Sequence, residues 1–140
     1  SLLAFTVQKE VADRLRAAAG SEAYGPLSVV VQTLADVEVL RTLPPQAFWP
    51  APKIESALVR LTRNDRIGAS AIPFGQFVRQ IFSFRRKTLS RALMQAGYDA
   101  PALLKVTGLD PQARPEMFTP AQMLDLFRAA AESRRLSSPS

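Results

Sequence analysis

Hydrophobic positions follow strand spacing in the first half of the chain and helical spacing in the second. The continuous apolar run over residues 1–7 predicts a strand that is buried on both faces, as in a parallel sheet. Residues 36–42 and 56–62 alternate between apolar and polar side chains, which predicts two more strands. The segment between these two strands is too short for a crossover helix, so we expect them to be antiparallel neighbours.

Two helices are expected between the first and second strands. Apolar positions at helical spacing predict one over residues 9–19, with Gly20 as its end. Pro26 is suited to the first turn of the other, which we expect to continue to about Leu34. The three valines at 29–31 would favour a strand by propensity alone. The order strand, helix, helix, strand, loop, strand is typical of the closing part of an α/β sheet.

A polar, turn-rich segment at residues 63–70 predicts a domain boundary. Residues 1–66 are then the C-terminal part of an α/β domain, and residues 67–132 form a small all-α domain. Residues 133–140 are expected to be a disordered tail. The fold class is therefore α/β followed by all-α.

Helical spacing and capping residues divide the all-α part into four helices. The expected helices cover residues 73–82, 89–96, 101–106 and a last segment from residue 120. The last has the clearest start, because Thr119 and Gln122 have the spacing of a capping box. Phe118 and Met123 are spaced as the hydrophobic staple that often accompanies one.

The net charge of +6 is concentrated in the second half of the chain. Residues 1–66 carry eight Lys and Arg against seven Asp and Glu, whereas residues 67–140 carry ten against five. The net charges are therefore +1 and +5. A basic excess on one part of a chain fits either solubility or a polyanionic partner such as nucleic acid.

The amino acids that are absent exclude several kinds of site. The chain has no cysteine and no histidine, so it has no disulfide, no thiolate or imidazole metal site and no Ser-His-Asp triad. No apolar run approaches the ~20 residues that span a bilayer, and no secretion signal is visible. We expect a cytoplasmic protein that binds neither a membrane nor a metal.

Aromatic and proline side chains meet in the loop that follows the second predicted strand. Phe48 and Trp49 stand beside Pro50 and Pro52, which fix the backbone and offer no donor to a strand ladder. Rigidly held aromatic faces suit stacking on a base that has left its helix. The same two aromatic side chains would serve equally as a plug for the core beneath the loop.

Basic side chains gather between the first two helices of the all-α part, where Arg85, Arg86 and Lys87 are consecutive and Arg91 follows. If a helix begins near Phe84, three cations lie in its first turn, where the helix dipole disfavours them. That cost would favour a function such as phosphate binding. If residues 74–96 form one continuous helix, the same cations are only a solvated face.

No residue pattern here indicates a catalytic centre or a cofactor pocket. The chain has no glycine-rich turn between a strand and a helix, and its carboxylates are scattered. The residues alone therefore indicate an incomplete α/β sheet, a proline-aromatic loop and a basic helical part.

Five blocks of the sequence, in order, resemble the KsgA-type small-subunit rRNA adenine dimethyltransferases. They include Tyr-Gly-Pro-Leu-Ser at 24–28, the proline-rich loop at 44–57 and Arg-Arg-Lys-Thr-Leu at 85–89. The block at 7–15 and the set Arg114, Pro115, Glu116, Thr119 and Gln122 complete the match. The resemblance runs from about residue 2 to residue 130. The antibiotic-resistance methyltransferases that act on 23S rRNA share the proline-rich loop but resemble the other blocks less.

The resemblance implies a Rossmann-like methyltransferase domain followed by a helical rRNA-binding domain. Such enzymes transfer methyl groups from S-adenosylmethionine to two adjacent adenines near the 3′ end of 16S rRNA. Their cofactor loop and catalytic Asn-Leu-Pro-Tyr motif precede the part that this chain matches. We therefore expect a fragment that is inactive by itself, from a parent that is monomeric at full length. A stand-alone rRNA- or ribosome-binding module and a degenerate gene fragment are the alternatives.

The resemblance also assigns roles to particular residues. Phe48 matches the residue that stacks on the target adenine, and Pro50, Pro52 and Lys53 belong to the same substrate-binding loop. The residues expected to contact rRNA are Arg79, Arg85, Arg86, Lys87 and Arg91. No catalytic or cofactor-binding residue is expected within the chain.

Overall fold

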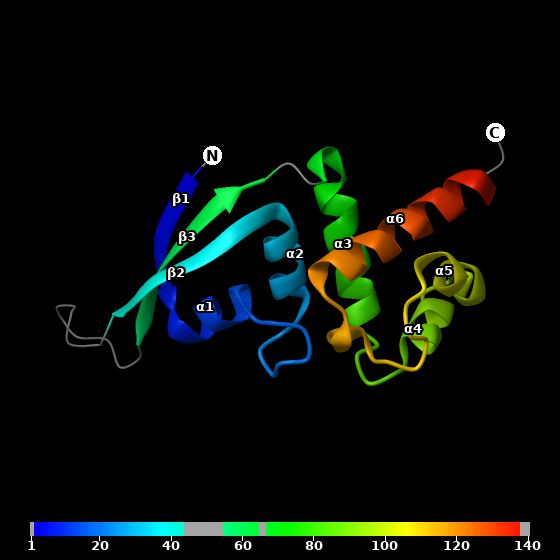
Figure 1. Ribbon diagram of the computed structural model, residues 1–140, viewed down its shortest axis with the longest axis horizontal. Coiled ribbons are helices and arrows are strands. Elements are labelled where there is room, and N and C mark those ends of the chain that lie inside the picture. Colours follow the sequence, from blue (N-terminus) through cyan, green and yellow to red (C-terminus); the bar gives the residue numbers. More distant parts are fainter. Residues whose placement is uncertain (1, 44–54, 65–66, 138–140) are drawn as a thin grey trace.

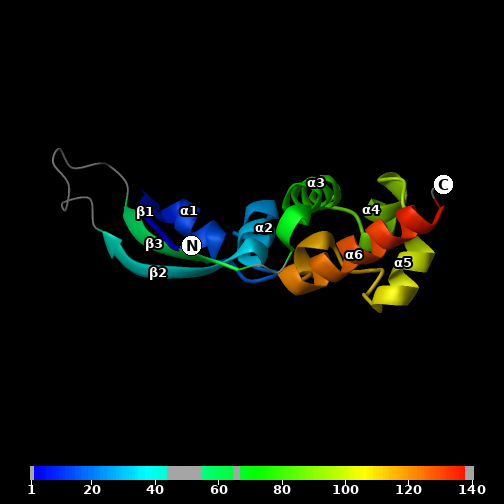
Figure 2. The same cartoon turned by 90° about the horizontal axis from the view of Figure 1, so that it is seen from above.

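The computed structural model describes residues 2–43, 55–64 and 67–137. A small sheet lies at one end of an elongated molecule and a cluster of helices at the other (Figures 1 and 2). The first part contains β1 (Leu2–Gln8), α1 (Lys9–Leu15), α2 (Pro26–Leu34), β2 (Ala35–Leu43) and β3 (Ser56–Arg63). The second contains η2 (Gly68–Ser70), α3 (Ala71–Phe82), α4 (Leu89–Gln95), α5 (Ala100–Thr107), η3 (Pro115–Met117) and α6 (Pro120–Ser137).

The sheet has the strand order β1-β3-β2, and both pairings are antiparallel. The prediction that the last two strands are antiparallel neighbours is confirmed. The prediction of a parallel, fully buried first strand is wrong for the described residues, because β1 pairs only with β3 there and lies at an edge. Leu2 and Leu3 at its start are 64% and 59% exposed. One face of the sheet is covered by α1, with Ala12 and Leu15 against Ala57 and Val59.

The first helix is shorter than the spacing predicts, and the second agrees with it. Helix α1 ends at Leu15, because the Gln32 side-chain amide donates to the carbonyls of Leu15 and Ala17 in place of a further helical turn. Helix α2 begins at Pro26 and ends at Leu34, as predicted. Its three valines therefore adopt a helix despite their strand propensity, since α2 packs against α3 and α6.

The helices of the second part begin and end close to their predicted positions. Thr88 and Asp99 cap α4 and α5 by accepting from the N–H groups of Arg91 and Ala102. The capping box of α6 is confirmed, with Thr119 Oγ1 accepting from Gln122 N at 3.1 Å and Gln122 Oε1 accepting from Thr119 N at 2.9 Å.

The segment between α3 and α4 follows neither of the two alternatives. Helix α3 ends at Phe82, residues 83–88 form turns, and α4 begins only at Leu89. The continuous helix is excluded because the N–H groups of Leu89 and Ser90 donate to the carbonyls of Ala113 and Pro111. These bonds fix the start of α4 against the loop before η3.

The last helix is longer than predicted, since α6 continues to Ser137 where a disordered tail was expected from residue 133. The Arg134 guanidinium lies over the Tyr98 ring at 4.3 Å from its centroid, which holds the extra turn against the rest of the helical part. The expectation for residues 133–137 is therefore wrong, and residues 138–140 lie outside the described chain.

The helical core reaches into the first half of the sequence. Tyr24 and Val29 are buried together with the α3 side chains Phe74 and Ile81. The Tyr24 hydroxyl donates to the buried carbonyl of Phe118, just before α6, at 2.6 Å. Helix α2 is therefore packed into the helical part as well as joined to the sheet. The division at residue 66 stays a prediction.

Candidate RNA interface

The three consecutive cations Arg85, Arg86 and Lys87 lie in the turns between α3 and α4. We call these three residues the basic turn. The N–H of Arg85 donates to the Phe82 carbonyl at 3.1 Å, and that of Lys87 donates to the Phe84 carbonyl at 2.8 Å. The backbone is thus held by its own turns, and all three side chains are exposed. Cations on a short, hydrogen-bonded turn suit contact with phosphates.

Ion pairing within the described residues leaves most of these cations available. Arg85 pairs with Glu116 of η3, with its Nη2 3.6 Å from the Glu116 Oε2. Arg86 and Lys87 make no ion pair with any described residue. The same holds for Arg79 on α3 and Arg91 on α4, both exposed. The structure therefore places the five predicted RNA-contacting residues on the surface of one continuous segment, which consists of α3, the turns that follow it and α4.

Glu116 is the residue of this region that sequence reasoning missed. Its backbone carbonyl accepts from Gly20 N at 2.9 Å, and its carboxylate faces Arg85. Contacts between segments so far apart along the chain leave no trace in helical or strand periodicity. Only its place beside Arg114 and Pro115 in one of the blocks that carry the resemblance marked it.

The predicted substrate-binding loop cannot be compared with the structure. Phe48, Pro50, Pro52 and Lys53 all lie in residues 44–54, outside the described chain. Their roles remain predictions.

A groove lies between α2 and α3 beside the basic turn, with a volume of about 580 Å³. Its lining is mainly apolar, and two of the predicted RNA-contacting residues, Arg79 and Arg85, stand along it. A space of this size is within the usual range for small-molecule sites.

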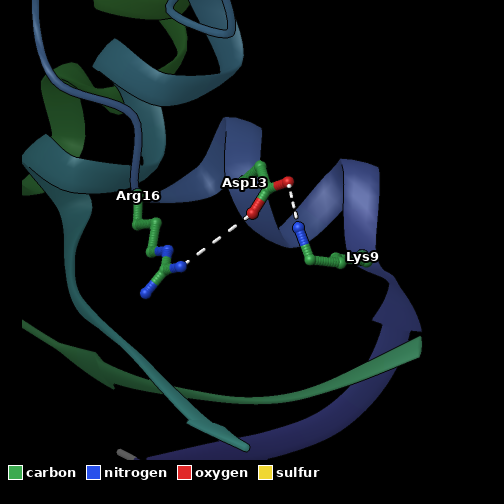
Figure 3. A network of polar contacts seen from close by, with 3 residues as sticks. All are labelled: Lys9, Asp13 and Arg16. Atoms are coloured by element: carbon green, nitrogen blue, oxygen red, sulfur yellow. Dashed lines mark hydrogen bonds and ion pairs between the residues drawn. The ribbon is translucent and has the colours of Figure 1, made fainter. Parts of the chain in front are cut away.

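The charged residues at α1 differ from the basic turn, because their cations are paired with carboxylates. Figure 3 shows Asp13 between Lys9 and Arg16, at 3.1 Å from the Lys9 Nζ and 4.0 Å from the Arg16 guanidinium. Glu10 and Arg14 form a further pair on the same helix at 2.9 Å. Cations here are matched by neighbouring carboxylates, as is typical of helix surfaces. At the α3–α4 segment, by contrast, four of the five cations have no carboxylate partner among the described residues.

Two other kinds of site are absent from the described residues. They contain no group of three potential metal ligands, and none of their helices is long and apolar enough to cross a membrane. Tyr24 has a raised pKa because its phenol is buried, but it lies inside the core and donates to a carbonyl.

Comparison with known proteins decides the family. The sequence profile described as "Ribosomal RNA adenine dimethylase" matches residues 2–132. The chain belongs to this family. Relatives include proteins named "Ribosomal RNA small subunit methyltransferase A" from Nitratidesulfovibrio vulgaris and Anaeromyxobacter dehalogenans. They are 42% and 45% identical over 132 residues, which are 92% and 89% of this chain and 50% and 46% of theirs.

Two solved structures share the fold. A dimethyladenosine transferase from Plasmodium falciparum superposes with a TM-score of 0.73 at 20% identity, over 89% of this chain and 55% of that one. The 23S rRNA methyltransferase ErmE gives 0.63 at 23% identity, over 93% and 55%. The predicted fold class and the resemblance to KsgA-type enzymes are confirmed. The chain spans about half the length of the relatives it matches.

Proposed function

We propose that this chain is the RNA-recognising half of an S-adenosylmethionine-dependent rRNA adenine dimethyltransferase. The observation that carries the proposal is the family match over residues 2–132 together with the exposed basic turn. Relatives at 42–45% identity are named as small-subunit methyltransferases, which favours 16S rRNA as the target. The proposed reaction methylates two adjacent adenines near the 3′ end of that RNA, in the cytoplasm during small-subunit biogenesis.

The cofactor is assigned to a part of the enzyme that this chain does not supply. A methyl-donor pocket of the Rossmann type needs a glycine-rich turn between a strand and a helix. In the described chain, β1 leads directly into α1 at Gln8 and Lys9 with no glycine between them. These residues therefore do not fit S-adenosylmethionine, and methyl transfer by this chain alone is not expected.

The basic turn and its neighbours are proposed to bind the phosphates of rRNA. The expected contacts are made by Arg79, Arg85, Arg86, Lys87 and Arg91. Exposed cations without carboxylate partners release bound counterions when they meet phosphates, which favours binding at low salt. Glu116 competes with phosphate for Arg85, so the Arg85 guanidinium must leave the Glu116 carboxylate in order to bind a phosphate.

The proline-rich loop is proposed to act on the target base itself. Phe48 would stack on the adenine, while Pro50 and Pro52 keep the loop stiff and Lys53 adds a positive charge beside the RNA. Stacking holds the exocyclic amine in position for transfer once the base has left its helix.

A non-catalytic rRNA-binding module is the second candidate function. The observation that favours it is that the described residues carry the exposed basic turn, while β1 leads into α1 without a glycine-rich turn between them. A 23S rRNA target is supported by the shared proline-rich loop and by likeness of fold to ErmE at 23% identity. This support is weaker than that of the small-subunit relatives at 42% identity.

The experiment that tests the proposed function measures methyl transfer from labelled S-adenosylmethionine to undermethylated 30S subunits. It compares this chain with a protein in which the N-terminal half of a relative is fused before residue 2. We expect activity in the fusion alone, and loss of that activity on Phe48→Ala. Activity in the short chain would overturn the assignment of the cofactor to the other half. An inactive fusion that still binds 30S subunits would favour the non-catalytic module.

A further inference from the structure

The groove between α2 and α3 has an apolar interior that is open to solvent. Leu27 and Val30 of α2 line it, together with Phe82 at the end of α3. Leu27 is 45% exposed, so part of its side chain remains open to a ligand. Figures 1 and 2 show α2 and α3 side by side where the sheet meets the helical cluster.

Charge at the rim of the groove complements one kind of ligand. Arg79 and Arg85 both line it, and both side chains reach solvent. An apolar slot with cations at its edge matches a nucleotide, whose base has two apolar faces and whose phosphates are anionic. The groove is also continuous with the basic turn, since Arg85 belongs to both.

Gly75 gives a second, independent indication that the space is needed. It stands inside the twelve-residue helix α3 and lines the groove, although glycine destabilises a helix interior relative to alanine. Its φ is not positive, and a Cβ placed on it would meet no atom within 4 Å. Neither backbone geometry nor close packing therefore requires glycine at this position. What its missing side chain provides is width in the groove.

We propose that this groove is a subsite for one unpaired nucleotide of the bound RNA, with the base between Leu27 and the Gly75 surface and the flanking phosphates on Arg79 and Arg85. The subsite rests on the proposed function, because it requires that the chain bind RNA through the adjoining basic turn. It gives the chain a means to prefer RNA with an extruded base over a continuous duplex.

The test fills the groove and measures binding by fluorescence anisotropy to two labelled RNA hairpins. One hairpin carries a single-nucleotide bulge, and the other has the same bulge without its base. Gly75→Leu should place a side chain in the groove, while Ala102→Leu adds the same side chain at an exposed position of α5 as the control. We expect Gly75→Leu to weaken binding of the bulged hairpin by about fivefold or more and to leave the abasic hairpin within about twofold. Ala102→Leu should change neither.

Leu27→Ala provides a second variant that does not depend on the fit of a new side chain. It truncates an exposed residue, so its thermal unfolding midpoint should stay close to that of the wild type. It should also weaken binding of the bulged hairpin while leaving binding of the abasic hairpin unchanged. If both variants bind both hairpins as the wild type does, the groove accepts some other occupant, such as a helix of a protein, and the subsite is overturned. Equal weakening of both hairpins also overturns it. If the wild type binds neither RNA, the proposed function itself fails.

Discussion

The hydrogen bond from Tyr24 to Phe118 joins two segments that lie 94 residues apart, and its removal tests how α2 is held in the helical part. The substitution Tyr24→Phe removes only the hydroxyl. The ring keeps its edge-on contact with Phe82, whose centroid is 6.2 Å away. The variant therefore separates the hydrogen bond from the packing of the aromatic side chain.

The size of the effect follows from burial. Tyr24 is 2% exposed, and its hydroxyl donates at 2.6 Å to a buried carbonyl that would be left without this donor. A hydrogen bond contributes about 1 kcal/mol net, and an unsatisfied buried group costs about 1–3 kcal/mol. We expect Tyr24→Phe to lower the free energy of unfolding by about 1.5–2.5 kcal/mol. For a domain of this size, that corresponds to a fall in Tm of roughly 5–10 °C.

The assay is urea unfolding followed by circular dichroism, with Tyr98→Phe as the matched control. Tyr98 is only partly buried, and its ring contacts Phe77 and Arg134 without a hydrogen bond from its hydroxyl among the described residues. The control should change the free energy of unfolding by less than about 0.5 kcal/mol. A Tyr24→Phe effect no larger than the Tyr98→Phe effect would refute the reasoning.

The same phenol makes stability depend on pH at the alkaline end. Burial raises the pKa of Tyr24 above its ordinary value near 10, so the folded state retains the proton that the unfolded state releases. Its contribution is fully present below pH 10 and is lost as the pH rises above it, by at most about 1.4 kcal/mol per pH unit. Tyr24→Phe should show a shallower loss than the wild type over this range. Equal slopes would contradict the buried neutral phenol.

Three further substitutions test separate features. Gly75→Ala should raise the free energy of unfolding by about 0.5–1 kcal/mol in a denaturant titration, since the new methyl group meets open space in a helix interior; a loss of stability would contradict this. Thr119→Ala should lower it by about 1 kcal/mol because the N–H of Gln122 loses its cap, and no change would mean that water replaces the hydroxyl. Glu116→Gln should increase RNA affinity at low salt by a few-fold, as Arg85 loses its carboxylate partner; weaker binding would show instead that Glu116 positions Arg85 for the RNA.

The elements that local pattern determines were predictable from the sequence. Helix α2 begins and ends where Pro26 and the apolar spacing place it, and the capping box of α6 was visible in Thr119 and Gln122. These features depend on residues within a few positions of one another. Periodicity and capping chemistry therefore carry enough information to locate them.

The features that were missed depend on contacts between distant segments. Helix α1 stops early because Gln32 supplies donors to its last carbonyls. A helix from Phe84 and a continuous helix over residues 74–96 are both wrong, because the first N–H groups of α4 bind carbonyls of the loop before η3. The edge position of β1 follows from its pairing with β3, which an apolar run cannot specify. The extension of α6 is accompanied by a cation–π contact between Arg134 and the ring of Tyr98, which lies outside α6.

The candidate site was predicted in part. The cations of the basic turn could be identified from charge and from the resemblance, but their exposure and the pairing of Arg85 with Glu116 could not. The groove was not predicted, because its two sides come from α2 and α3 and meet only through packing. Gly75 was the one local signal, as a glycine inside a helical pattern.

The measurement that tests the central claim most directly is the salt dependence of RNA binding. The ligand is a hairpin taken from the 3′ end of 16S rRNA, and the chain is compared with the variant in which Arg85, Arg86 and Lys87 are all alanine. A control variant removes three exposed cations elsewhere: Arg41, Arg63 and Lys105. If the basic turn binds phosphates, the slope of log affinity against log salt should fall in magnitude by about 2 or more in the first variant and by less than about 1 in the control. Equal slopes in all three proteins would contradict the proposal that this turn is where the chain meets RNA.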